Sequence, residues 1–340
     1  MTAAVRLRDV AGHLPGPPVP ASFFTEYPQA QDELRNSPMF KVPSLRHHVT
    51  DGETNVDLVE EAIASLVDRW GRDEIRAVDV LLMHSQLPEI PFVGAAGEVA
   101  QRLGLRPSWV IDVANAGCAS FVHMLQLARQ ILVTTEARRA LICNAQTMAG
   151  QLFTQSRVRG LAQAAIPGDG CGVAYLTTGA SGSRVLGLRA HHLAAYAGQM
   201  RLEREDGRRY WEAGDGQPRV GFSMDGVAAV LERGNRLVPA VVRDVCQEVG
   251  ATGADIDVLI TNQPNRTFLR TWREALGLPA ERHPDTFDRY GNLFGAAMPI
   301  TLDHAAATGQ IPDGALVVLG GFAHAGDYAG AVAIRWEGRG

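Results

Sequence analysis

Several features common in other classes of protein are scarce or absent in this 340-residue chain. Its four cysteines (Cys118, Cys143, Cys171 and Cys246) lie far apart, too few for a disulfide scaffold and without the spacing of a metal site. No apolar run approaches the roughly 20 residues that a membrane-spanning helix needs, and residues 1–20 hold no apolar core of signal-peptide type. The formal net charge of −5 argues against general binding of nucleic acid. We therefore expect a cytoplasmic protein that binds neither nucleic acid nor a membrane.

Cofactor motifs are missing as well. The chain has no glycine-rich dinucleotide motif, so the sequence implies no nicotinamide or flavin. Histidines occur in pairs at 47–48 and 191–192, but no cysteine or carboxylate completes a ligand pattern around them. We expect neither a metal nor another cofactor. The composition, 46% hydrophobic and 20% charged, is that of an ordinary globular protein with a large core.

A faint internal repeat runs through the chain. Residues 78–84 (VDVLLMH) resemble residues 256–262 (IDVLITN), and each segment follows a helix-like stretch. Residues 140–143 similarly resemble 315–318. Because strands alternate with helices in both halves, the pattern predicts an α/β architecture built by duplication. A further apolar strand, 171–176 in the first half and 330–334 in the second, is expected to complete each unit.

Cys118 lies where a predicted strand gives way to a predicted helix. A short apolar segment, 109–113, breaks at small residues, and a helix-like stretch, 122–132, follows the thiol. Small neighbours let a substrate approach, while first-turn N–H groups and the helix dipole stabilise a thiolate. A thiolate can accept an acyl group as a thioester, which indicates acyl transfer through a covalent intermediate. The other interpretation is a buried structural cysteine, since free cysteine packs as a small hydrophobe.

Four separated segments give a more specific signal. They are DVANAGC at 112–118, PGDGCG at 167–172, TNQPN at 261–265 and RYGNLFGAA at 289–297. In this order they resemble one family, the type III β-ketoacyl-ACP synthases of the thiolase superfamily. The second is similar to that family's GDGAGA turn, the third stands in the place of its PHQAN, and the fourth resembles its RxGNTSAAS. The order and spacing fit over roughly residues 50–336.

The resemblance implies a fold and a reaction. The fold would be a five-layered αβαβα arrangement of two similar halves, residues 1–180 with the nucleophile and residues 181–340 with the asparagine loops, usually in a homodimer. Cys118 would be the nucleophile. In the family, a histidine and an asparagine then aid decarboxylation of a malonyl thioester and stabilise the enolate. The asparagine maps onto Asn292, but the histidine maps onto Asn262.

Asn262 changes the expected chemistry. An imidazole moves protons near neutral pH, whereas a carboxamide can only donate or accept hydrogen bonds. Asn262 and Asn292 are both expected to point donors at one thioester carbonyl, at roughly 3 kcal/mol per contact. Decarboxylative condensation is therefore handicapped. Transfer of a ready-made acyl group needs less, and an acceptor thiol needs little help from a base because its pKa is close to neutral.

Another histidine could replace the missing base. His324 lies in GGFAHAGD at 320–327, which resembles the family's glycine-rich segment beside the nucleophile, whose backbone N–H helps to form an oxyanion hole. Gly326 in the same loop is expected to contact the substrate. His84 occupies the repeat position equivalent to Asn262 and is a second candidate. The alternative for each histidine is a loop residue with a structural hydrogen-bond partner or in solvent.

Two further features concern the carrier protein and the pocket. Arg266, Arg270 and Arg273 fall on one face of a predicted helix, which suits docking of an acidic acyl carrier protein or, alternatively, a solvated surface. The resemblance places Phe92 where family members have an aromatic residue that reaches across the dimer and closes the partner's acyl pocket. A plain loop anchor is the alternative for Phe92.

Three functions follow as hypotheses. The first is an acyltransferase of secondary metabolism, such as polyketide biosynthesis, that loads an acyl group from a carrier protein or CoA thioester onto Cys118. It would then pass that group to a second carrier or a small-molecule acceptor without decarboxylation. The second is a priming β-ketoacyl-ACP synthase III that condenses an acyl-CoA starter with malonyl-ACP, using a relocated base such as His324. The third is a non-catalytic partner subunit with the thiolase fold.

Overall fold

A single mixed sheet runs through the molecule. The computed structural model describes residues 4–32, 41–114, 116–209, 211–216, 218–222 and 226–338. Within these residues the sheet has nine strands in the order β11-β12-β13-β8-β1-β7-β6-β4-β5. The strands are β1 (Arg6–His13), β4 (Val80–Ser85), β5 (Trp109–Asp112), β6 (Arg139–Gln146), β7 (Gly170–Thr177), β8 (Ser183–His192), β11 (Val258–Thr261), β12 (Leu316–Ala323) and β13 (Tyr328–Arg335).

The predicted duplication is confirmed strand by strand. In the first half β4 pairs in parallel with β6, which pairs antiparallel with β7; in the second half β11, β12 and β13 do the same. β1 then extends the first set and β8 the second, both antiparallel. A short ladder, Arg6 with Arg184 and Leu7 with Ser183, joins the two sets. The proposed boundary at 180 and 181 falls between β7 and β8 and stays a prediction.

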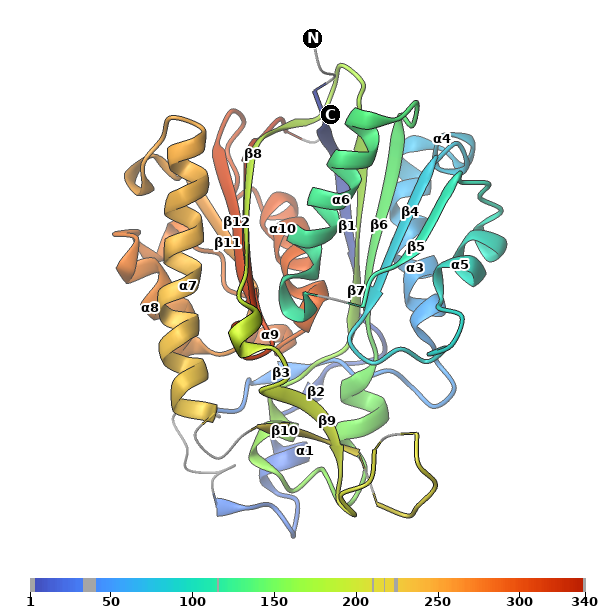
Figure 1. Ribbon diagram of the computed structural model, residues 1–340, viewed down its shortest axis with the longest axis vertical. Coiled ribbons are helices and arrows are strands. Elements are labelled where there is room, and N and C mark those ends of the chain that lie inside the picture. Colours follow the sequence, from blue (N-terminus) through green and yellow to red (C-terminus); the bar gives the residue numbers. More distant parts are fainter. Residues whose placement is uncertain are drawn as a thin grey trace.

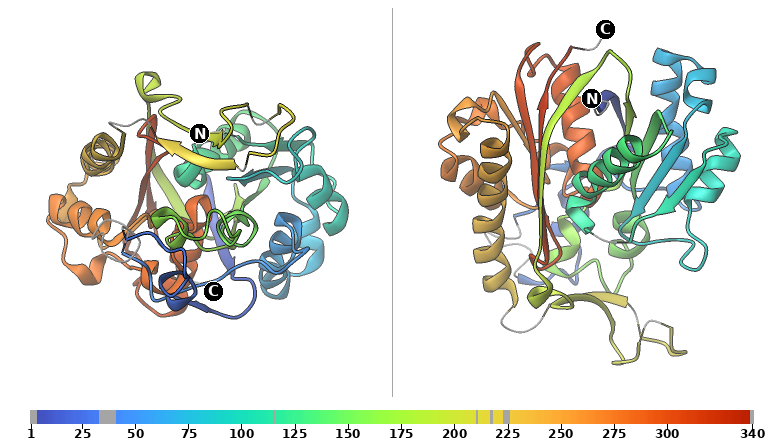
Figure 2. Two further views of the ribbon diagram at one scale, coloured as in Figure 1. Left: turned by 90° about the horizontal axis from the view of Figure 1, so that it is seen from below. Right: turned by 45° about the horizontal axis from the view of Figure 1, so that its top comes forward.

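Helices make the other three of the five predicted layers (Figures 1 and 2). Two central helices lie between the two sets of strands, and both contact strands of both halves. The outer helices cover the opposite faces, on the right and left of Figure 1. The central pair is α6 (Ser120–Thr134) and α10 (Ala297–Ala307); the outer ones are α3 (Asn55–Trp70), α4 (Arg72–Arg76) and α5 (Ala96–Leu103) on one side and α7 (Gly226–Glu248) and α8 (Arg266–Ala275) on the other.

Burial follows from these layers. β6, β7, β12 and β13 are buried along almost their whole length because helices cover both faces, and their sequences are accordingly near-continuous apolar runs. α6 buries Phe121, Met124 and Leu125 completely between the halves. The helix that follows the candidate nucleophile is therefore packed at the centre of the molecule.

Shorter elements form a cap at the lower end in Figure 1. Two small antiparallel ladders, β2 with β3 and β9 with β10, lie there beside α1. Their bounds are β2 (Val19–Pro20), α1 (Ser22–Thr25), β3 (Leu45–Arg46), β9 (Met200–Arg204) and β10 (Pro218–Phe222), and α9 (Phe287–Tyr290) precedes the Asn292 loop. Among the residues described, we find no helix that combines the length and the apolar character needed to cross a membrane.

Candidate active site

Cys118 sits in a tight turn between β5 and α6. It belongs to η1 (Gly117–Ala119), directly before the first residue of α6. Two left-handed residues shape this turn, Ala116 with φ 70° and Gly117 with φ 35°. An alanine in that region costs about 1–2 kcal/mol, so the surrounding packing must hold the turn. Cys118 is partly exposed, unlike the other three cysteines, which are buried.

The thiol is not activated by its surroundings in the way the sequence suggests. Burial of the sulfur raises the pKa of Cys118 to about 12 and outweighs the hydrogen bond from its own backbone N–H, which lowers the pKa. The prediction that the helix N-terminus alone stabilises a thiolate is therefore wrong for this site. Because the free thiol stays protonated near neutral pH, the sulfur needs a group that removes its proton as it attacks.

His324 lies beside the nucleophile turn. It follows β12 at once and adopts a left-handed backbone with φ 48°. A β-carbon built on Gly117 would lie 2.7 Å from His324 Nε2, so the ring lies against the residue that precedes Cys118. The structure thus places the imidazole that the sequence proposed as a base against the turn that carries the proposed nucleophile.

The Asn292 loop closes on the same turn from another side. Phe294 N–H donates to Asn292 Oδ1 at 3.0 Å, which leaves the amide NH₂ of Asn292 as a donor. A β-carbon on Gly295 would lie 2.3 Å from Ser120 Oγ and 3.1 Å from the Gly117 carbonyl oxygen. Only a glycine allows this close approach, and it places the loop against the start of α6.

Asn262 is buried at the end of β11, where the resemblance implies a histidine. Its side chain is 1% exposed, and a β-carbon on Gly321 of β12 would lie 2.7 Å from its Oδ1. This oxygen has no hydrogen-bond partner in the described part of the chain. His283 lies nearby, but its Nε2 bonds Thr261 Oγ1 at 2.9 Å, and successive side chains of a strand face opposite ways. His283 therefore does not take the place of the missing imidazole beside Asn262.

His84, the second candidate base, is buried and neutral. Its Nδ1–H donates to the Val113 carbonyl oxygen at 2.7 Å. The pKa of His84 is lowered to about 4, chiefly by burial, and the electrostatic effect of His324 contributes in the same direction, which shows that the two rings lie within electrostatic reach. A neutral, poorly basic imidazole is a hydrogen-bond partner and a weak proton acceptor at neutral pH.

Gly326 and Phe92 are the two predicted substrate contacts. The Gly326 N–H donates to the Ala323 carbonyl oxygen at 2.8 Å, so the turn itself uses this donor. Phe92 is 98% exposed and lies on the loop before α5. The carboxylate of Asp112, at the end of β5, accepts hydrogen bonds from the backbone N–H groups of Ala95 and Ala96 and so holds the end of this loop. The roles of both residues stay predictions.

The three arginines of α8 share one face, as expected, but differ in their contacts. Arg266 forms an ion pair with Asp288, so part of its charge is engaged. The side chain of Arg270 is 63% exposed, and its ion pair with Glu274 spans 3.9 Å. The opposite face of the helix is buried through Phe268, Leu269 and Trp272.

Sequence reasoning missed one partner of His324 and one neighbour of Gly117. Asp327 lies 3.1 Å from His324 Nδ1, and Gln86 Oε1 would lie 3.3 Å from a β-carbon built on Gly117. The spacing of His324 and Asp327 in one glycine-rich turn was the available signal for the first. Nothing in the sequence around Gln86 marks it as close to the thiol.

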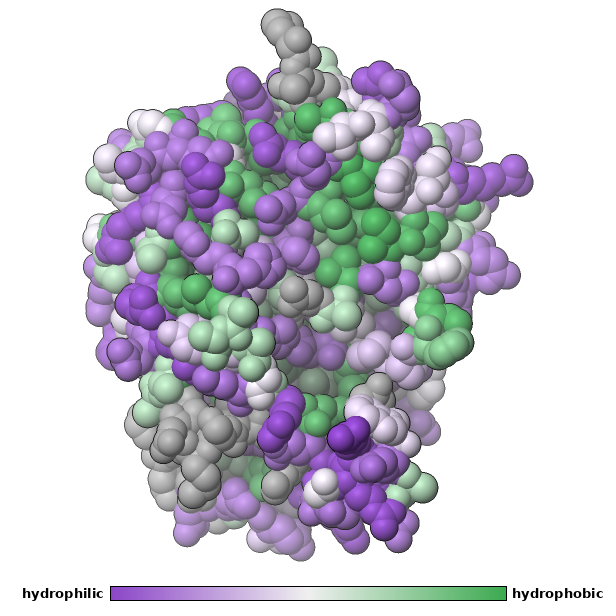
Figure 3. Space-filling view, in the orientation of Figure 1, coloured by the Kyte–Doolittle hydropathy of each residue, from purple (hydrophilic) through white to green (hydrophobic). Residues whose placement is uncertain are grey.

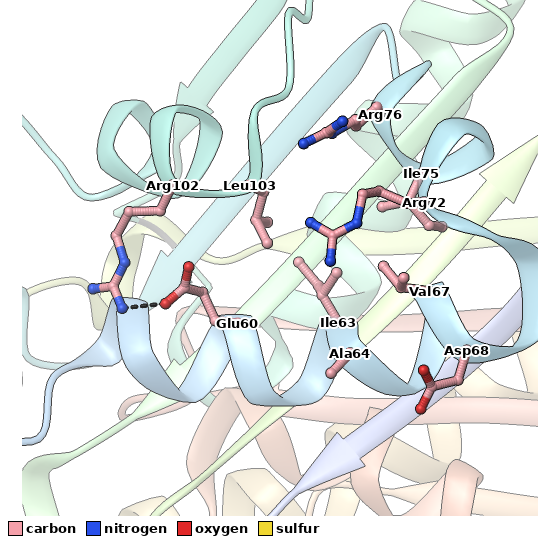
Figure 4. Close-up of a pocket in the computed structure, with 10 residues that line it drawn as sticks. All are labelled: Glu60, Ile63, Ala64, Val67, Asp68, Arg72, Ile75, Arg76, Arg102 and Leu103. Atoms are coloured by element: carbon pink, nitrogen blue, oxygen red, sulfur yellow. Dashed lines mark hydrogen bonds and ion pairs between the residues drawn. The ribbon is translucent and has the colours of Figure 1, made fainter.

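One cavity lies far from this site, on the outer layer (Figure 4). It has about 270 Å³ and is lined by α3, α4 and α5, with Arg102 paired to Glu60 at one end. We assign it no role. Among the described residues, no three histidine, cysteine, aspartate or glutamate side chains gather so that they could hold a metal ion.

Comparison with known families agrees with this geometry. The family model described as 3-oxoacyl-[acyl-carrier-protein (ACP)] synthase III matches residues 111–193, and the model of its C-terminal part matches residues 246–336. Together they span a little over half of the chain, including the Cys118 turn, both asparagine loops and the His324 turn. The chain belongs to the synthase III-like proteins of the thiolase superfamily.

Other members of the synthase III family are distant relatives over most of their length. The β-ketoacyl-ACP synthase III of Chelativorans sp. (strain BNC1) is 29% identical over 302 residues, 86% of this chain and 87% of that protein. The enzyme of the same name from Neisseria meningitidis serogroup B is 28% identical over 293 residues, with the same two shares. The chain is accordingly an enzyme of this family.

Solved structures confirm the thiolase fold. The synthase III of Pseudomonas aeruginosa superposes with a TM-score of 0.81 at 23% identity, covering 98% of both chains. A tetronic acid condensing enzyme superposes with a TM-score of 0.83 at 20% identity, covering 98% of this chain and all of that one. The priming β-ketosynthase of the R1128 polyketide pathway gives 0.82 at 18% identity, covering 99% of this chain and 97% of that one. At these identities the likeness concerns the fold alone.

Proposed function

We propose that this protein is an acyltransferase of secondary metabolism. It takes an acyl group from a carrier-protein or CoA thioester onto Cys118 and passes it to a second carrier or a small-molecule acceptor, without decarboxylation. The observation that carries this proposal is the carboxamide of Asn262 in the position for which the family resemblance implies an imidazole. The relatives' names supply the acyl-carrier thioester as the class of substrate.

The groups around Cys118 suit transfer. Formation of an acyl-Cys118 thioester requires removal of the thiol proton and stabilisation of an oxyanion. His324 Nε2 lies against the nucleophile turn, and its Nδ1 bonds a carboxylate, so the neutral ring presents an acceptor for that proton. The amide of Asn292 remains free to donate to a carbonyl oxygen.

Decarboxylation of a malonyl thioester makes different demands. Loss of CO₂ releases no proton to a base, but it needs hydrogen-bond donors that stabilise the enolate oxygen. A neutral His324 whose Nδ1–H is bound to Asp327 has an acceptor, not a donor, at Nε2. Only the two amides are left for the enolate, which is why we rank transfer above condensation.

A second candidate is a priming β-ketoacyl-ACP synthase III. The comparisons favour this candidate, because the relatives carry that name and one structural neighbour is a priming β-ketosynthase. His324 also provides the relocated base on which this candidate depends. Both candidates share the acyl-Cys118 intermediate and differ in the second half-reaction.

One experiment separates the two. The protein is incubated with a panel of acyl-CoA and acyl-ACP donors, and its intact mass is measured by mass spectrometry. The Cys118→Ala variant is the control, which must not gain mass. The acylated protein is then given malonyl-ACP labelled at the free carboxyl carbon. We expect a mass gain on Cys118 and release of CO₂ no faster than from Cys118→Ala; efficient CO₂ release coupled to a β-ketoacyl product would establish the condensing enzyme instead.

A homodimer completes the proposal. β5 forms an open edge of the sheet, and Trp109 and Val110 on it are 42% and 44% exposed. Phe92 and Val93, on the loop before α5, are 98% and 72% exposed. A hydrophobic patch lies over this region on the face shown in Figure 3. Exposed apolar edge strands tend to pair with another chain unless charged residues, proline or a bulge prevent the pairing. A second copy of this chain at β5 would therefore cover these side chains. Phe92 would then face that copy, as the resemblance implies.

A further inference from the structure

His324 is held by Asp327 within one short turn. The Nδ1–H of His324 donates to both carboxylate oxygens of Asp327, at 3.1 and 3.2 Å. The two side chains are 25% and 19% exposed, so solvent reaches the pair only in part. A carboxylate at Nδ1 fixes the proton of a neutral imidazole on that nitrogen and leaves Nε2 as the acceptor.

The other edge of the same ring faces the nucleophile turn. His324 Nε2 lies so close to Gly117 that any side chain at 117 would meet it. His324 also has the left-handed backbone that residues other than glycine rarely adopt. Three features, the backbone, the carboxylate and the glycine, therefore point Nε2 toward the residue before Cys118.

Groups from every neighbouring element bear on His324. β4 brings the neutral ring of His84, η1 brings Gly117 against the ring, and Gln86 adds an amide oxygen beside Gly117. From α7, Arg233 packs against Gly326 in the same turn, and its guanidinium also binds Gln199. Asp327 brings the negative charge that offsets a proton on His324 within this group.

We propose that Asp327 is a positioning residue, which holds His324 in the tautomer and orientation that accept the proton of Cys118 during acylation. The inference rests on the proposed acyl-Cys118 intermediate. The same nucleophile–base–carboxylate order operates on unrelated folds, where the carboxylate orients the imidazole and stabilises its charged form.

The proton and the acyl group can be followed through both steps. As Cys118 Sγ bonds to the carbonyl carbon of the donor thioester, its proton moves to His324 Nε2. The donor's carbon–sulfur bond breaks, and the leaving thiolate takes that proton. In the second step the acceptor's thiol or hydroxyl proton moves to Nε2, the acceptor bonds to the acyl carbon, and Cys118 leaves as a thiolate that regains the proton from Nε2.

The test compares two His–Asp pairs of the same chain. His191 and Asp244 form an exposed pair at 2.9 Å on β8 and α7, so Asp244→Asn is the matched control for Asp327→Asn. The probe is the acyl-CoA, among acetyl-, butyryl- and benzoyl-CoA, that labels the wild-type protein fastest. We expect Asp327→Asn to slow acylation of Cys118 by about 10²- to 10⁴-fold at pH 7 and to change the pH profile of acylation. Alkylation of Cys118 by iodoacetamide, which needs no positioned base, should stay within about threefold of wild type.

Three results would overturn the inference. One is an Asp327→Asn variant with the acylation rate and pH profile of the wild type. Another is a double variant, Asp327→Asn with His324→Ala, whose acylation rate falls by the product of the two single effects, because the effects of residues that act as one unit do not combine in this way. The third result concerns Asp327→Glu, which keeps the carboxylate and should retain at least about a tenth of the wild-type acylation rate. If Asp327→Glu loses as much of the acylation rate as Asp327→Asn, the charge at this position is irrelevant. Asp327→Glu decides alone if the asparagine variant does not fold. Absence of acylation in the wild type would instead refute the proposed function itself.

Discussion

The raised pKa of Cys118 makes a quantitative prediction about its reactivity. Iodoacetamide reacts with the thiolate, so the rate of alkylation follows the fraction of thiol that has lost its proton. An ordinary thiol with a pKa of 9.0 is about one tenth thiolate at pH 8, whereas a pKa of about 12 leaves about one part in 10⁴. We therefore expect Cys118 to react about a thousandfold more slowly than a free cysteine peptide at pH 8.

The pH dependence has a definite sign. Because burial destabilises the thiolate, the rate should rise about tenfold for each pH unit from 7 to 10, without a plateau. A thiol whose pKa is lowered by a helix N-terminus or an imidazolium would instead reach its plateau below pH 8. The two cases differ most at pH 6 to 7, where the expected rates are furthest apart.

The assay is intact mass spectrometry over time, followed by peptide mapping to separate the four cysteines. Cys118→Ala reports labelling of Cys143, Cys171 and Cys246, which are buried and should react only as the protein opens. A plateau below pH 9, or a rate at pH 8 within tenfold of the free peptide, would refute the reasoning that burial dominates this thiol. The need for His324 as a proton acceptor would then disappear.

Three further substitutions test other parts of the molecule. Asn262→His should create release of CO₂ from malonyl-ACP, or leave the activity unchanged; a total loss of acyl transfer would show that Asn262 itself binds the carbonyl. Arg270→Glu should raise KM for an acyl-ACP donor by about tenfold and leave an acyl-CoA donor unaffected, whereas Arg138→Glu, on the first half, should change neither. Val110→Lys on the β5 edge should convert a dimer to a monomer in sedimentation velocity, and Leu202→Lys on β9 is the control; a monomeric wild-type protein would remove the proposed interface.

The repeat gave most of the fold, because strand pairing obeys the same rules in both halves. Apolar runs of similar length at 78–84 and 256–262 became β4 and β11, and their neighbours paired in the same senses. The position of β1 was not predictable. Residues 6–13 mix charged and apolar side chains, and only the fold shows that they pair with β7 and β8 at the centre of the sheet.

The sequence predicted the parts of the site that depend on local motifs, but it missed the properties that depend on burial. Cys118 and the loops of Asn292 and His324 converge as their motifs imply. The pKa of the thiol was predicted with the wrong sign, because a helix N-terminus can be read from sequence but the desolvation of one sulfur cannot. Asp327 lies only three residues from His324, yet its contact depends on a left-handed backbone that the sequence HAGD does not specify.

The place of β1 bears on how the chain is made. This strand leaves the ribosome well before its partners β7 and β8, which span residues 170–192. At about 5–20 residues per second, the nascent β1 waits on the order of ten seconds or longer before either neighbour exists. Until then its apolar positions Leu7, Val10 and Ala11, buried in the finished protein, remain unpaired, which makes this interval the period of greatest need for a chaperone.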